Sequence, residues 1–130
     1  MYMEILFLIG RVLFGGFFIY NAYGHLANLT ATSGYAQMKG VPMPKAATVL
    51  TGLMLLAGGL SILLGFRPLI GIFILLAFLI PMTLVMHQFW ATADPMQKGM
   101  ERVQFSKNAA LVGALLMLIP FALTAWSYAL

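Results

Sequence analysis

An almost unbroken apolar run over residues 69–90 constrains the fold of this chain more than any other feature of its sequence. About 20 apolar residues make a helix long enough to cross the hydrocarbon core of a bilayer. In that core every backbone polar group needs a partner within the protein, which a helix supplies. Three more runs are comparable, so the predicted spans are residues 5–23, 46–66, 69–90 and 106–126.

The composition agrees with this interpretation. Hydrophobic residues make up 62% of the 130 residues and charged residues only 8%, whereas a soluble domain carries roughly 25% charged residues. We therefore expect one integral membrane domain over residues 1–130, with its first span retained rather than cleaved as a signal peptide. The absence of cysteine excludes disulfides, thiolate metal sites and thiol redox chemistry.

The breaks between the spans predict an all-α, up-down four-helix bundle. Pro44 lies where the first turn of the second span should begin, and "GFRP" at residues 65–68 should end that span. The segment "ADPMQ" resembles a capping box, with Asp94 as N-cap and Gln97 at N3. We expect short interfacial helices in loop 1, across "SGYAQMKG", and in loop 3, over residues 95–102.

The net charge of +4 comes from seven scattered basic residues against three acids, which excludes a nucleic-acid partner and favours contact with membrane lipid. Most of the basic residues lie on the face that carries loops 1 and 3. The positive-inside rule then places these loops in the cytoplasm and both termini outside, in what we expect to be a prokaryotic inner (plasma) membrane. Small residues such as Gly15, Gly16 and Gly59 are expected where helices pack closely.

Arg11 is a charged residue about two turns inside the first span. It shares a helical stripe with Phe18, Asn21 and His25, which should face the bundle interior. Arg11 either snorkels to the headgroups or pairs with Glu4, or else it is a buried cation that holds an anionic or quinone oxygen or a partner.

A second group of polar residues should meet at the loop-side mouth of the bundle. Spans one, three and four contribute Asn21, His25, His87, Lys107 and Asn108 there, with Gln88 beside them. Histidine relays protons near neutral pH, but neither histidine has an acidic or histidine partner at a usual metal-ligand spacing, so we predict no metal site. Trp90, in "MHQFW", is either an interfacial anchor or part of this mouth.

These residues define the candidate site. The ligand-binding candidates are Arg11, Asn21, His25, His87, Trp90, Lys107 and Asn108. No constellation of Ser, His and carboxylate is found, so hydrolysis is improbable, no catalytic residue is predicted and enzymatic activity stays open.

Several motifs in their order resemble the DoxX family of small four-span membrane proteins. They are "GRVLFGGFFIYNAYGHL", the first loop with the second span, "MHQFW", and "FSKNAALVGALLML" at the last span. The sequence departs from the family at His25, where many members carry a basic residue, and at Leu55, where many carry an acid. Without that acid, Arg11 needs another counter-group, for which a neighbouring subunit is one source.

The resemblance implies an association with membrane redox complexes. The first hypothesis is a non-catalytic or accessory subunit of a membrane redox or respiratory complex, with other membrane subunits or further copies of the chain as partners. The alternative is a quinone-binding oxidoreductase subunit with its site at the loop-side mouth, and the third is a small-molecule carrier. No intrinsic cofactor is expected, and quinone is the candidate for a bound one.

Overall fold

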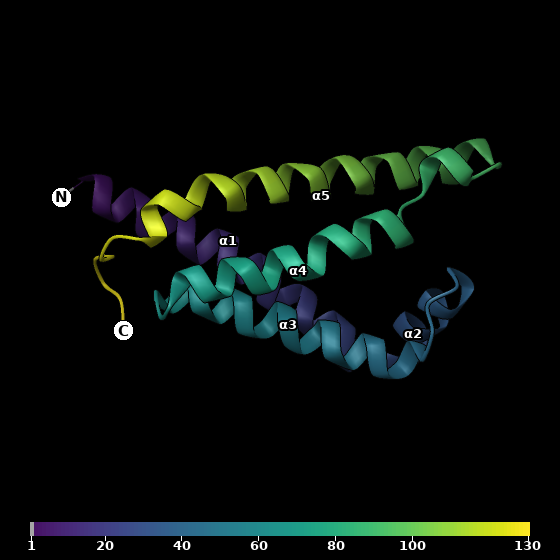
Figure 1. The fold of residues 1–130 in the computed structure, drawn as a ribbon, viewed down its shortest axis with the longest axis horizontal. Coiled ribbons are helices and arrows are strands. Elements are labelled where there is room, and N and C mark those ends of the chain that lie inside the picture. Colours follow the sequence, from purple (N-terminus) through teal and green to yellow (C-terminus); the bar gives the residue numbers. More distant parts are fainter. Residues whose placement is uncertain (1) are drawn as a thin grey trace.

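The computed structural model describes residues 2–130, which are helical over most of their length and contain no strand (Figure 1). The elements are α1 (Tyr2–Ala27), α2 (Leu29–Met38), α3 (Pro44–Leu64), α4 (Pro68–Met86), the short 3-10 helix η1 (Phe89–Ala91) and α5 (Pro95–Ala122). The long helices α1, α3, α4 and α5 are each long and apolar enough to cross a membrane. The predicted all-α class with four spans is confirmed.

The connections differ from the prediction in one respect. Loop 1 contains α2, as expected, but residues 95–102 of loop 3 do not form a separate helix, because they are the first two turns of α5. Asp94 Oδ2 accepts the predicted capping bond from Gln97 N at 2.9 Å. No proline interrupts residues 96–119, so nothing ends this helix before the membrane span begins.

Three spans end earlier than predicted, and the smallest difference is in α3, which stops at Leu64 instead of residue 66. Helix α4 stops at Met86 instead of residue 90, and His87 is its C-cap residue. Helix α5 stops at Ala122, two residues after Pro120, instead of at residue 126. The segment "MHQFW" therefore leaves the helix at its histidine.

Close backbone approach joins α1 to α3. A Cβ built on Gly15 would lie 2.8 Å from the carbonyl oxygen of Gly59, and one on Gly59 would lie 2.9 Å from that of Gly15. A Cβ on the neighbouring Gly16 would meet nothing within 4 Å. Of the small residues predicted at helix contacts, Gly15 and Gly59 are thus confirmed, whereas Gly16 faces away.

This pair gives a matched test of the packing. We expect Gly15→Ala to destabilise the protein by about 1–3 kcal/mol, because two backbones would have to separate. Gly16→Ala should be neutral or stabilise by up to about 1 kcal/mol, since alanine is the better helix former. Unfolding of both variants in the same detergent measures the difference. Equal stabilities would contradict the close contact of α1 with α3.

The helices pack in the order α1, α3, α4, α5, and the seam between α1 and α5 is the open one. Among residues 2–130, the backbones of α1 and α5 do not pack against each other as the other neighbouring pairs do. Side chains bridge the seam instead: Phe7 lies 6.2 Å from Phe121 between ring centroids, and Lys107 Nζ lies 5.6 Å from the centroid of Phe17. The apolar core, which includes Phe18, Leu55 and Leu75, lies between α1, α3 and α4.

Candidate functional site

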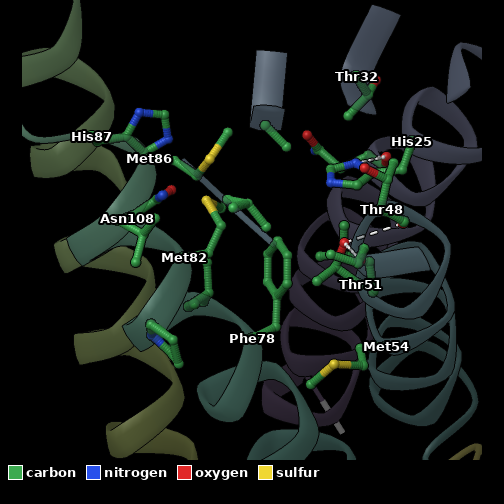
Figure 2. A pocket seen from close by; sticks show the side chains of 18 of the residues that line it. His25, Thr32, Thr48, Thr51, Met54, Phe78, Met82, Met86, His87 and Asn108 are labelled. Carbon is green, nitrogen blue, oxygen red and sulfur yellow. Dashed lines mark hydrogen bonds between the residues drawn. The ribbon is translucent and has the colours of Figure 1, made fainter. Parts of the chain in front are cut away.

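A cavity of about 740 Å³ occupies the half of the bundle near α2 and His87, which we call the loop end. Figure 1 shows α5 and α3 diverging toward this end. Figure 2 shows His87 and Asn108 on one side of the cavity and His25 and Thr48 on the other, with Phe78 between them. Most of the lining is apolar, and polar atoms occur on both facing walls.

His87 is held on its wall by a carboxylate. Its Nδ1 lies 2.7 Å from Glu101 Oε2, and an ionised carboxylate can only accept a hydrogen bond. The hydrogen of this bond is therefore on Nδ1, and Nε2 is left for other partners. A carboxylate that fixes a histidine in this way determines its tautomer and its orientation.

Glu101 ties three elements together at the loop end. It is buried, with 5% of its surface exposed, and its Oε1 accepts from the Tyr35 hydroxyl at 2.6 Å and from Lys39 Nζ at 3.3 Å. Burial, and then the hydrogen bond and the charge of Glu101, raise the pKa of the Tyr35 hydroxyl, so it stays a donor. Glu101 thus fastens α2 and the end of α4 to α5.

His25 is fixed on the opposite wall by its own helix. Its Nδ1 lies 3.1 Å from the carbonyl oxygen of Asn21, which can only accept, so Nδ1 carries the hydrogen here as well. The ring packs edge-on against Phe78, 6.0 Å between centroids. The Asn21 amide donates to the carbonyl oxygen of Phe17 at 2.8 Å. Both histidines therefore keep Nε2 free of these bonds.

Asn108 is a polar residue of the cavity lining with a buried side-chain donor that lacks a partner among the described residues. It is 2% exposed, and its Nδ2 has no hydrogen-bond partner within residues 2–130. A buried amide donor without a partner costs about 1–3 kcal/mol. Such a donor in the lining of a cavity is suited to a ligand acceptor.

The remaining predicted site residues divide into two groups. Lys107 lines the cavity and extends toward Phe17 across the open seam. Arg11 and Trp90 do not line it: Trp90 is half exposed and packs against Phe89 and Phe105. The cavity therefore brings together five of the seven candidates, namely Asn21, His25, His87, Lys107 and Asn108.

Arg11 lies at the opposite end of the bundle, where it caps α3. It is 3% exposed, and its guanidinium donates to the carbonyl oxygens of Ile62 at 3.2 Å and Leu63 at 3.0 Å. It also donates to Ser127 at 2.7 Å and Tyr128 at 3.2 Å in the C-terminal segment. A neighbouring subunit was one expected source of a counter-group for Arg11, but its hydrogen-bond partners are carbonyl groups of the same chain. Arg11 is therefore satisfied although position 55 carries a leucine instead of an acid.

Comparison with known proteins decides the family. The DoxX family model matches residues 6–88, which is more than half of the chain. The chain belongs to the DoxX family. Searches of curated proteins and of solved structures gave no match.

The DoxX match includes most of α1 and all of α2, α3 and α4, and with them Asn21, His25 and His87. It ends before α5, so Glu101, Lys107 and Asn108 lie outside the matched residues. The resemblance that we saw in "FSKNAALVGALLML" is therefore untested. In this DoxX protein the His25 wall of the cavity lies inside the family match, whereas the other wall combines His87 from the matched residues with Lys107 and Asn108 from α5.

The sequence interpretation missed Glu101 and its partners Tyr35 and Lys39. Glu101 was assigned to a separate interfacial helix, and His87 was considered to lack an acidic partner. One signal was available: Glu101, Asn108 and Leu115 are seven residues apart, which places them on one helix face, and they are the three buried residues of α5. A continuous helix from the Asp94 cap would have brought Glu101 back beside the end of α4.

Proposed function

We propose that this DoxX family protein binds the head of a quinone-class ligand in the loop-end cavity. The observation that carries the proposal is the cavity of about 740 Å³, whose apolar walls bear polar groups on two facing sides. Ligand sites of this size commonly combine mostly apolar linings with a few polar groups that fix orientation.

The placement of the polar groups favours a quinone over a simple acyl chain. A para-quinone carries two carbonyl oxygens that point in opposite directions from a flat apolar ring. His25 belongs to one wall, and His87 with the unpartnered Asn108 amide to the other (Figure 2). A fatty acyl chain needs no polar group on two facing walls.

The two histidines have a defined task in such a site. Each is anchored through Nδ1, so each can offer Nε2 to a ligand oxygen. Nε2 of a neutral ring accepts a proton and Nε2 of a protonated ring donates one. The histidines thus bind the oxygens and hold protons there, while electron transfer requires a redox partner.

Asn108→Leu separates binding from stability. We expect this variant to bind a short-chain benzoquinone about five- to tenfold more weakly, because it loses one hydrogen-bond donor. Its stability should stay equal or rise by about 1 kcal/mol, because the unpartnered amide of the free protein is removed. Isothermal titration of the purified protein and unfolding in the same detergent measure both.

Gln88→Leu is the matched control. Gln88 carries the same amide near the same end, but it donates to the Leu84 carbonyl oxygen at 3.0 Å and does not line the cavity. The Gln88→Leu variant should bind the benzoquinone with the affinity of wild type. If Asn108→Leu also binds with the wild-type affinity, the Asn108 amide does not contact the ligand.

The subunit hypothesis is the second candidate, and the surface of α5 supports it. Helix α5 packs mainly on α4 and buries only three residues, so most of its surface faces outward. A partner helix or a second copy could cover this surface, and so could lipid. Copurification of a partner protein in mild detergent would support this hypothesis. The partner should be lost from the Val103→Lys variant, because Val103 is exposed on the outer face of α5.

A further inference from the structure

The outer face of the bundle has an apolar groove between α3 and α4. Its volume is about 500 Å³, and its lining is formed by α3 residues such as Leu53 and Ala57 and by α4 residues such as Phe73. Leu53 and Phe73 are each about half exposed. In a membrane this groove faces acyl chains.

The groove adjoins the loop-end cavity, because the two share lining residues. Leu50, Met54 and Ala77 line both, and Figure 2 shows Met54 among the residues of the cavity lining. Closer to their hairpin the two helices pack tightly, since a Cβ on Gly58 would collide with the side chain of Leu75. They diverge from there toward the loop end (Figure 1). Head cavity and groove therefore meet where α3 and α4 begin to separate.

We propose that the groove between α3 and α4 holds the apolar tail of the ligand whose head occupies the cavity. The inference rests on the proposed function and narrows the ligand to a lipid quinone with an isoprenoid tail. A quinone ring with an apolar tail matches the arrangement of the two volumes. The ring would lie among the polar groups of the cavity, and the tail would pass Met54 into the apolar groove. The tail then continues into the bilayer, so the ligand does not have to leave the membrane to bind.

A tail-length series tests the inference. Benzoquinones with one common head and zero, one, two or four isoprene units are titrated against wild type and Ala57→Trp. Burial of the apolar tail favours binding, but lipid already shields part of the tail in the unbound state, so we expect the two-unit quinone to bind about tenfold tighter than the tail-free one. In Ala57→Trp the indole fills the groove, and this ratio should fall to about one while the tail-free quinone binds as in wild type.

Ala109→Trp is the matched control, because Ala109 is exposed on α5 and lines neither volume. Partition of the tail into detergent is the same for all three proteins. A change in the ratio of the affinities for tail-bearing and tail-free quinone therefore reports the contribution of the groove. If Ala57→Trp keeps the wild-type ratio, the groove does not hold the tail, although the head site stands. If wild type binds neither tail-free nor tail-bearing quinone, the proposed function fails and the tail site with it.

Discussion

Glu101→Ala should destabilise the protein by about 3–5 kcal/mol, the typical cost of removing one partner from a buried ion pair. Three donors lose their acceptor together: the Tyr35 hydroxyl, Lys39 Nζ and His87 Nδ1. The side chains of Glu101 and Lys39 are 7% and 18% exposed, so water compensates only in part. Glu101→Gln should cost less, because its amide oxygen still accepts a hydrogen bond.

The measurement is unfolding in detergent, with Glu4→Ala as the control. Glu4 is an exposed acid in the first turn of α1 and should change stability by less than about 0.5 kcal/mol. Because the chain has no cysteine, Ser33→Cys gives a second readout on α2, where Ser33 is 8% exposed. Labelling of this cysteine should become faster when Glu101 is replaced. Equal stability of Glu101→Ala and Glu4→Ala, with unchanged labelling, would contradict the anchoring of α2 by Glu101.

Arg11→Leu should destabilise by at least about 3 kcal/mol. The last four carbonyl groups of a helix lack partners inside it, and in α3 all four are satisfied from nearby: Ser61 by Gly65 and Phe66, Leu64 by Leu130 N, and Ile62 and Leu63 by Arg11. Loss of the guanidinium leaves the buried carbonyl of Ile62 and the part-buried carbonyl of Leu63 unpaired, and a buried unpaired group costs about 1–3 kcal/mol. It also removes a positive charge from the negative end of the α3 dipole.

The variants of Arg11 should differ in their C-terminal segment. Arg11 holds this segment through Ser127 and Tyr128, so protease should cut near residues 127–130 more readily in Arg11→Leu. Arg11→Lys should recover only part of the stability, because one ammonium group cannot match the planar fork that meets four acceptors. Arg102→Leu, at an exposed arginine of α5, is the control. A fully stable Arg11→Lys would show that charge alone, without the fork geometry, suffices.

The helical spans could be predicted from sequence because each depends on a local property. A run of about 20 apolar residues has no alternative to a helix in lipid, and the stops at Gly65 and Pro68 and the cap at Asp94 are local chemistry. The extent of α5 was misjudged, because its polar first turns resemble a separate interfacial helix in composition. Only the absence of a helix-breaking proline between residues 96 and 106 distinguishes one continuous helix from an interfacial helix followed by a span.

The candidate site could be predicted only in part for a related reason. Depth along a helix is readable from sequence, so His25, His87 and Asn108 were correctly expected at one level. Helix rotation is set by packing between helices, which a single sequence does not give. Trp90 therefore was included although it lies outside the cavity, and Arg11 was considered a ligand residue although it caps α3. The contacts of Tyr35 and Lys39 with Glu101 depend on how α2 is placed relative to α5. No local sequence pattern determines this placement.

Titration of the wild-type protein with a short-chain benzoquinone tests whether the loop-end cavity holds a quinone head. We expect saturable binding at one molecule per chain, competed by a tail-bearing quinone and weakened about five- to tenfold by Asn108→Leu. A flat titration in both detergent and lipid nanodiscs, with protein whose unfolding is cooperative, would contradict this proposal.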